Sequence, residues 1–299
     1  KFSLKFNPNI DNQLDYEILG RLTKETQDQN YISSVIGTIN QLDQAETFSI
    51  NQNLNYYYTL DEKNIFALEA QHLIKDEDPF YNALLENNAN YQTTASGLGF
   101  DNSLSFYNIA QEKRVKSNQL DAKIDYWNIL NKKSDINFTL GVIYSQQQFD
   151  SEIFQFLSEN NENIYDPTPS INEGLDYNDV NYLFNDVYLG IHYRLKSGKF
   201  IISPGFTAHS YNSENTQTNP SDSNESNYKK SFYKILPDFN MIIQFKDSES
   251  LRLNYAMRTQ FTDVSKIARG LVLNNYNSIF SGTQDLQNAL SHNISLNYN

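Results

Sequence analysis

The chain contains no cysteine among its 299 residues, which excludes a disulfide framework, a zinc site with cysteine ligands and a thiol nucleophile. Long apolar runs are also missing. No stretch approaches the roughly 18 consecutive apolar residues that a transmembrane helix needs. Positive charge is scarce: 36 acidic residues face 23 lysines and arginines. The resulting net charge of −13 disfavours binding to nucleic acid or to an anionic membrane surface.

Aromatic residues are abundant on a polar background. The chain has 21 tyrosines and 19 phenylalanines, yet its mean hydropathy is −0.62. A soluble protein rarely combines these two properties. The wall of a membrane β-barrel does, because only alternate residues contact lipid and the others line a wet lumen.

Alternation of apolar and polar residues recurs along the whole chain and predicts strands. The stretch 136–144 is an example, with Ile136, Phe138, Leu140, Val142 and Tyr144 on one face and Asn137, Thr139 and Gly141 on the other. Read in this way, the sequence predicts about eleven strands, at roughly 1–7, 14–25, 45–60, 63–75, 112–130, 133–150, 180–196, 199–213, 229–246, 249–263 and 286–299.

The predicted connections alternate between short and long. Short polar turns are expected near Pro8 to Gln13, Asp61, Asn131, Ser197 and Asp247, and long loops at 26–44, 76–111, 151–179, 214–228 and 264–285. Outer-membrane barrels have short periplasmic turns and long extracellular loops. The fold class is therefore predicted as all-β, a transmembrane antiparallel up-and-down β-barrel. A soluble β-sandwich rich in tyrosine is the alternative.

Aromatic residues on the apolar face gather near the short turns, where a periplasmic girdle of rings is expected. They are Phe6, Tyr58, Tyr126, Tyr193, Phe200, Phe245 and Tyr298. Eleven strands cannot close a bacterial single-chain barrel, whose strand number is even. No signal peptide is visible and the chain opens with Lys1. We therefore expect residues 1–299 to be part of one barrel domain of a longer precursor.

The most specific residues lie in the last 70 positions. They are Tyr233-Lys-Ile-Leu-Pro-Asp-Phe239, Leu251-Arg-Leu-Asn-Tyr-Ala-Met-Arg258, Phe261-Thr-Asp-Val264, Ile279-Phe-Ser-Gly-Thr-Gln-Asp-Leu286 and His292-Asn-Ile-Ser-Leu-Asn-Tyr298. This pattern resembles the barrel of TonB-dependent receptors, especially the Bacteroidota-type outer-membrane β-barrel family. The chain departs from that family at Gly282-Thr-Gln-Asp-Leu286, where Gly-Asn-Pro-x-Leu is usual, and at Thr259-Gln-Phe261, where Arg-x-Pro is usual.

The resemblance implies an about 22-stranded barrel of which this chain supplies about 11 strands. It also implies an N-terminal plug domain and a TonB box, and we expect both, with the remaining strands, to lie outside this stretch. The implied partners are outer-membrane lipid, TonB through that N-terminal region, and a surface lipoprotein or other subunits of an outer-membrane complex. The implied location is the bacterial cell outer membrane.

Candidate chemical sites are few. No cofactor is expected, and no serine, histidine and acid set with a supporting motif is visible, so we expect no enzyme active site. His72 and His292 have the lipid-facing parity and His192 and His209 the lumen-facing one, without a metal-binding spacing. Asp76, Glu77 and Asp78, with Asp176 and Asp179, are candidate calcium ligands in or beside long loops; solvated acidic loops are the alternative.

Five basic residues have the lumen-facing parity: Arg21, Lys123, Arg194, Arg252 and Arg258. They are candidates for binding a plug domain or guiding an anionic substrate, and the alternative is ordinary pairing with neighbouring acids. Three functions remain open. The leading one is a TonB-dependent transporter that imports a bulky nutrient, such as a metal chelate, a glycan or a peptide. The others are a non-transporting barrel subunit of an assembly or secretion complex, and a passive porin.

Overall fold

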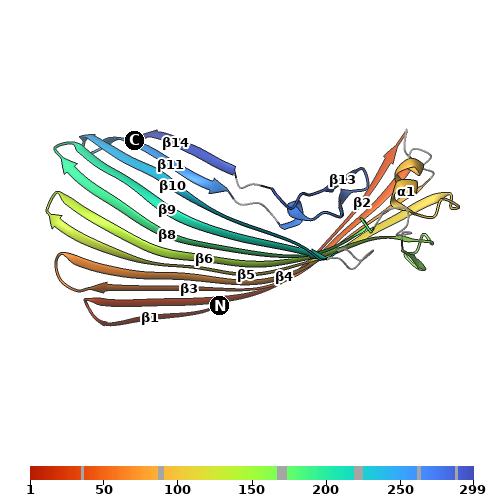
Figure 1. Ribbon diagram of the computed structural model, residues 1–299, viewed down its shortest axis with the longest axis horizontal. Helices are drawn as coiled ribbons and strands as arrows, with labels where there is room; N and C mark the ends of the chain where they lie inside the picture. The colour runs from red at the N-terminus through yellow and green to blue at the C-terminus, as the bar shows by residue number, and fades with distance from the viewer. Residues whose placement is uncertain (35–36, 87–90, 167–173, 219–224, 261–263, 287–288) are drawn as a thin grey trace.

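One antiparallel sheet contains most of the chain. The computed structural model describes residues 1–299 except 35–36, 87–90, 167–173, 219–224, 261–263 and 287–288. Strands that follow each other along the chain are neighbours in the sheet, as Figure 1 shows. The path contains eleven strands: β1 (Phe2–Asn9), β2 (Asn12–Ser33), β3 (Gly37–Thr59), β4 (Asn64–Glu86), β5 (Phe106–Asn131), β6 (Ser134–Phe156), β8 (Tyr177–Ser197), β9 (Phe200–Thr218), β10 (Glu225–Lys246), β11 (Glu249–Gln260) and β14 (Ala289–Tyr298). The predicted all-β, up-and-down architecture with eleven strands is confirmed.

Tight turns join the strands at one end of the sheet, called here the turn end, which lies on the left of Figure 1. They occupy residues 10–11, 60–63, 132–133, 198–199 and 247–248. Side-chain hydrogen bonds and a glycine stabilise two of these turns. The Asp61 carboxylate accepts hydrogen bonds from the backbone N–H groups of Lys63 and Asn64, at 2.7 and 2.9 Å. Gly198 has a φ of 57°, in the left-handed region that glycine adopts without strain.

The opposite end, called the loop end, corrects the predicted loop boundaries. The segments 26–44 and 76–111 were predicted as long loops, but β2 continues to Ser33, β3 begins at Gly37, and β4 continues to Glu86. β6 likewise extends to Phe156 and β9 to Thr218. These segments lack the apolar stripe on which the prediction depended, because their outer face is polar. They are extended because each pairs with its neighbours in continuous register.

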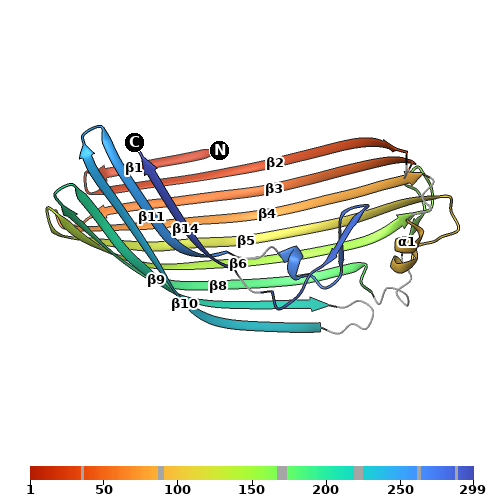
Figure 2. The ribbon, with the colours of Figure 1, turned by 90° about the horizontal axis from the view of Figure 1, so that it is seen from above.

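Two inward elements cover one face of the sheet near the loop end. The first is helix α1 (Gln92–Leu98). The second is the inner segment, residues 264–286, which carries the 3-10 helix η1 (Val264–Ile267) and the hairpin of β12 (Leu271–Asn275) and β13 (Ser278–Ser281). Figure 2 shows this hairpin crossing the sheet, between α1 and the obliquely running β11 and β14. A short strand, β7 (Ile164–Tyr165), pairs with the end of β6 outside the main path.

The buried apolar core lies between these elements and the sheet. One cluster joins Ala95 and Leu98 of α1 to Leu85 and Ile109 of the sheet and to Leu273 of β12. A second joins Val264, Ile267 and Val272 of the inner segment to Phe149 and Val180 of the sheet. The inner segment is therefore packed against the sheet as part of the core.

The sheet is not closed. Along the described path β1 pairs only with β2, and β14 pairs only with β11, so the structure is a partial barrel wall. β10 and β11 also separate: their pairing runs from Lys246 and Glu249 to Asp238 and Ala256, and Pro237 is the next residue of β10. Proline has no N–H to donate to a neighbouring strand, which explains why the ladder ends at this point.

Candidate functional site: the lumen face of the sheet

The two faces of the sheet differ in chemistry. The outer face carries Leu140, Val187 and Leu189, whose side chains are about half exposed. On each strand of the sheet's middle this apolar pattern continues for about ten residues from the turn end. On β6, for example, it spans Ile136 to Tyr144 and is followed by Gln146 and Gln148. An outward apolar band of this length matches the roughly 25 Å height of the lipid-facing band of a membrane barrel.

Above this band the outer face is charged. Arg114 on β5 pairs with Asp76 on β4 at 3.0 Å, and Lys229 on β10 pairs with Glu214 on β9 at 2.8 Å. The hydrogen bond from Arg114 is the main cause that lowers the pKa of Asp76 below its usual value. Charged pairs of this kind indicate water rather than lipid around the loop end of the strands.

Aromatic side chains border the apolar band at the turn end. Phe6, Phe200, Phe245 and Tyr298 project from the outer face with exposed fractions of 55%, 44%, 42% and 65%. Each lies a few residues from a turn or a strand terminus. This placement is typical of rings at a membrane interface.

The opposite face, called the lumen face, carries polar and charged networks at the level of the apolar band. Lys123 contacts Glu69 at 3.0 Å and Asp125 at 3.1 Å. His192 contacts Asp238 at 2.9 Å, and His209 contacts Asp186 at 2.8 Å. Buried ionisable groups are tolerated when they are paired and hydrogen-bonded. A polar face of this kind suits the interior of a barrel and not a bilayer.

The five predicted lumen cations all lie on the lumen face by strand register. Lys123 and Arg194 have acidic partners, and the partner of Arg194 is Asp135 at 3.0 Å. Within the described chain, no ion pair is formed by Arg21, Arg252 or Arg258. The structure therefore brings two of the five into ion pairs and leaves three facing the lumen. A role for them in binding a plug or a substrate stays a prediction.

The predicted acidic cluster is not a loop cluster. Asp76, Glu77 and Asp78 lie inside β4, where successive side chains point to opposite faces. Asp76 pairs with Arg114 on the outer face, and Glu77 pairs with Lys75 on the lumen face. Their predicted position in a loop was therefore wrong. Among the described residues, no group of three or more acidic or histidine side chains is arranged to hold a metal ion.

A ladder of rings crosses the lumen face from β8 to β10. Tyr188 stacks on His209 with a centroid distance of 5.2 Å, His209 on Tyr211 at 5.1 Å, and Tyr211 contacts Phe232 at 4.8 Å. The Tyr188 ring also lies across Gly141 of β6, where a β-carbon would collide with it. A residue without a side chain is required at that position for this close approach. The ladder gives the lumen a rigid aromatic surface.

Polar side chains of the wall hold the inner segment in place. The Gln217 amide donates to the Ile267 carbonyl at 2.6 Å and accepts from the Arg269 N–H at 3.0 Å. The Asn178 amide bonds the inner segment in the same way, through the Gly270 N–H at 2.7 Å and the Leu271 carbonyl at 3.2 Å. Both side chains are buried. The wall therefore satisfies the backbone of the inner segment with matched donors and acceptors.

Three more wall residues complete this attachment near β12. Gln111 accepts from the Leu273 N–H at 3.0 Å, Lys113 donates to the Leu273 carbonyl at 2.8 Å, and the Tyr81 hydroxyl accepts from the Tyr276 N–H at 2.8 Å. Burial lowers the pKa of Lys113 and raises the pKa of Tyr81. Sequence reasoning missed Asn178, Gln217 and Gln111 because each lay in a predicted loop. The continuing alternation, as in Tyr211, Ser213, Asn215 and Gln217, was the available signal.

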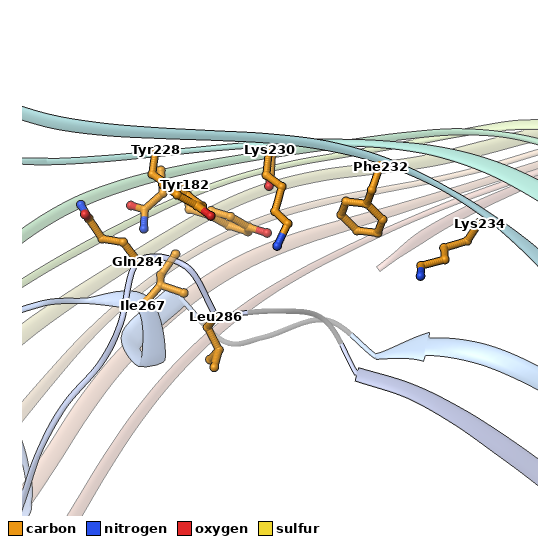
Figure 3. A pocket seen from close by; sticks show the side chains of 10 residues that line it. Tyr182, Tyr228, Lys230, Phe232, Lys234, Ile267, Gln284 and Leu286 are labelled. Carbon is orange, nitrogen blue, oxygen red and sulfur yellow. The ribbon is translucent and has the colours of Figure 1, made fainter.

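Several recesses open on the lumen face. One of about 740 Å³ lies beside the ring ladder and is bordered by His209 and Arg258. Another of about 290 Å³ lies between Gln71, Asp121 and Phe184. A further one, of about 150 Å³, lies between β10 and the inner segment and is shown in Figure 3.

Neither α1 nor η1, the helices of the described chain, is long and apolar enough to cross a membrane. The lipid-matched outer face, the polar lumen face and the open antiparallel sheet define the wall of a β-barrel of the bacterial outer membrane. The chain belongs to the outer membrane protein beta-barrel family, whose family model matches residues 78–299. No curated protein sequence matches the chain.

Solved structures are similar to this fold at low sequence identity. The ferric-catecholate import receptor Fiu from Escherichia coli K12 matches with a TM-score of 0.56 and 9% identity, over 99% of this chain and 53% of that one. The ferric yersiniabactin uptake receptor FyuA from Yersinia pestis matches with a TM-score of 0.40 and 10% identity, over 99% and 48%. A Pseudomonas aeruginosa FadL homologue matches with a TM-score of 0.41 and 10% identity, over 86% and 61%. The chain thus spans about half the length of the receptor Fiu.

Proposed function

We propose that the chain forms about half the wall of a TonB-dependent receptor-like transporter that imports a bulky nutrient across the outer membrane. The observation that carries the proposal is the open eleven-stranded wall, which is a partial barrel and supports a wider one. Barrels of about eight strands are filled by their own side chains, whereas barrels of about 22 strands hold a plugged lumen. The likeness in fold to the receptor Fiu over 99% of this chain supports a barrel of that larger kind.

The lumen face supports a role in binding rather than in free diffusion. The inner segment is packed and hydrogen-bonded across the wall, so it narrows the lumen at the loop end. A passive porin keeps an aqueous channel. The same face offers rings, ion pairs and recesses, which suit the binding of a ligand by a carrier. The C-terminal motifs quoted above support the Bacteroidota-type subfamily.

The nutrient class is a metal chelate, a glycan or a peptide, and coupling would run through TonB and a plug domain outside these residues. The test uses the intact protein in the bacterium that produces it. Deletion of its gene and, separately, inactivation of TonB should abolish growth on the same nutrient in a panel of these three classes. A growth defect that does not depend on TonB would contradict the proposal and favour a porin.

One alternative is kept because the charged outer surface at the loop end offers contacts for other subunits. In that case the chain is part of a non-transporting barrel in an assembly or secretion complex. Stoichiometric co-purification with a surface lipoprotein or an assembly machine, without any nutrient phenotype in the deletion strain, would replace the transport proposal with this one.

A further inference from the structure

We propose that the recess between β10 and the inner segment binds an elongated dianion with a flat apolar body. Its two charges would contact Lys230 and Lys234, and its flat body would lie against Phe232. The inference deepens the proposed function, since it names a chemical class of ligand for the lumen.

Side chains of β10 border the recess. Lys230, Phe232 and Lys234 alternate along β10 and so share one face of the strand. Figure 3 shows the three side chains projecting toward the segment that carries Ile267 and Leu286. The Cα atoms of the two lysines are separated by about 13 Å, four residues at the rise of a β-strand. Flexible lysine side chains at that spacing can reach both ends of one small ligand.

The size of the recess limits the body of that ligand. Its volume is about 150 Å³. An apolar cavity of about 150 Å³ accepts one benzene-sized ring. The recess therefore fits a single ring or a sugar-sized unit, with its charged ends extending toward the two lysines.

Two of these side chains bring positive charge to the recess. The chain has a net charge of −13, and Lys123 and Arg194 on the same face have acidic partners. Across the residues described by the structure, no carboxylate forms an ion pair with Lys230 or Lys234. Two unpaired cations on one wall of a recess attract an anion. In a chain with an excess of acidic residues, lysines placed at random would be expected to have acidic neighbours.

A buried hydrogen-bond donor of the described chain lies unsatisfied at the same recess. Asn215, on β9, lines the recess and is only 2% exposed. Its side-chain oxygen accepts a hydrogen bond from Gln217 at 3.3 Å, but its Nδ2 finds no acceptor among the described residues. A buried donor without a partner costs about 1–3 kcal/mol. An oxygen of a bound anion would satisfy it.

The Phe232 ring is packed against a neighbouring ring. Phe232 is held by Tyr211, whose ring lies 4.8 Å away and stacks in turn on His209. Tyr182 and Tyr228 border the same recess, and Ser213 and Gln284 add polar groups. A ring fixed by its neighbours binds a flat apolar face without losing much conformational freedom. Both an aromatic ring and the apolar face of an acidic sugar meet this requirement.

The experiment measures binding to the full-length protein, purified in detergent, by titration with saturation-transfer NMR. The two probes are benzene-1,4-disulfonate, an aromatic dianion with one ring, and methyl glucuronoside 3-sulfate, a single acidic sugar with two charges. Sulfate, which has two charges but no flat body, and caffeine, which is flat but neutral, are the comparison ligands. Because sulfate has no protons to observe, its binding is measured by its displacement of the bound probe. Saturable binding of one probe, with weaker binding of sulfate and caffeine, is expected. The probe that binds shows whether the natural ligand is an aromatic dianion or an acidic sugar.

The variants assign the site. Lys230→Gln and Lys234→Gln should each weaken binding of the probe by about 10-fold or more, the worth of a charge-assisted hydrogen bond. Lys230→Arg should retain it, which separates lost charge from a misfolded wall. Lys229→Gln is the matched control, because Lys229 is the neighbouring residue on the outer face and pairs with Glu214.

Failure of this inference is distinct from failure of the transport proposal, because the assay requires neither TonB nor uptake. Equal binding by Lys229→Gln and by the Lys230→Gln/Lys234→Gln double variant would overturn the site. Saturable binding of neither probe would also overturn it, as would sulfate binding as tightly as the probes. A growth phenotype that is independent of TonB would leave the binding result standing while refuting coupled transport.

Discussion

The attachment of the inner segment to the wall through Gln217 gives a prediction with a defined magnitude. Gln217 donates to the Ile267 carbonyl at 2.6 Å and accepts from the Arg269 N–H at 3.0 Å. Gln217→Leu keeps the approximate volume of the side chain and removes both bonds. Each buried backbone group left without a partner costs about 1–3 kcal/mol, or roughly 2–6 kcal/mol together. Added apolar contact with the neighbouring core offsets about 1–2 kcal/mol of this cost.

The expected net loss is therefore roughly 1–4 kcal/mol in the free energy that holds the inner segment against the wall. Because about 1.4 kcal/mol corresponds to a tenfold change in an equilibrium constant, local opening should increase by about 5- to 700-fold. Hydrogen exchange of the backbone amides between Val264 and Asn275, followed by mass spectrometry on the solubilised protein, measures this opening.

Gln147→Leu is the matched control for this prediction. It makes the same change on the lumen face, where the Gln147 amide donates to Ser145 and not to the inner segment. Exchange in the inner segment should stay as in the unmodified protein. If Gln217→Leu also left the exchange unchanged, apolar packing alone would hold the segment, and the argument from matched hydrogen bonds would be wrong.

Three further predictions test the faces, the ends and the charge of the wall. Leu140→Arg, on the lipid-facing band, should destabilise the folded barrel by roughly 2–4 kcal/mol, whereas Thr207→Arg, on the lumen face at the same level, should cost much less; equal losses in denaturant unfolding would refute the assignment of faces. Because the chain has no native cysteine, single Glu159→Cys and Lys132→Cys variants can be labelled cleanly on whole cells with an impermeant maleimide. We expect reaction at the first, on the loop end, and none at the second, on the turn end; the reverse pattern would invert the topology. Burial lowers the pKa of Lys113, so the unfolded chain binds more protons than the folded one between that lowered pKa and the ordinary value of 10.5. The inner segment should therefore become more stably held as the pH rises through this window, and Lys113→Met should remove the dependence, with hydrogen exchange corrected for intrinsic rates as the measurement.

The transmembrane part of the wall was predictable because its determinants are local. Alternation placed Leu140 and Thr139 on opposite faces, and turn chemistry at Asp61 and Gly198 placed the short connections. These signals need only a few consecutive residues and a bilayer on one side. The strand extensions beyond the bilayer were missed because water on the outer face removes the apolar stripe, as at Asp76 and Arg114.

For the candidate binding residues, too, the sequence predicted the face of the strand but not the contacts made there. The sequence identified the lumen-facing parity of Lys123 and Arg194 but not that both have acidic partners. Lys230, Phe232 and Lys234 share one parity within a predicted strand, so their common face could have been read from the sequence. Their significance depends on Leu286, which only the folded chain brings to the opposite side of the recess.

The sequence by itself determined the class of fold, the number of strands, the outward apolar band and the short turns, because period-two alternation and turn residues act over short distances. Only the tertiary structure decided that residues 264–286 turn inward and close on the wall. Lys113 and Leu273 are 160 positions apart, and their hydrogen bond exists because the sheet curls and brings these strands to one face. Near the loop end the apolar side chains of the alternating pattern lie on the lumen face instead of the outer face. Ile109 and Phe149 are examples, and there the inner elements rather than lipid exclude water.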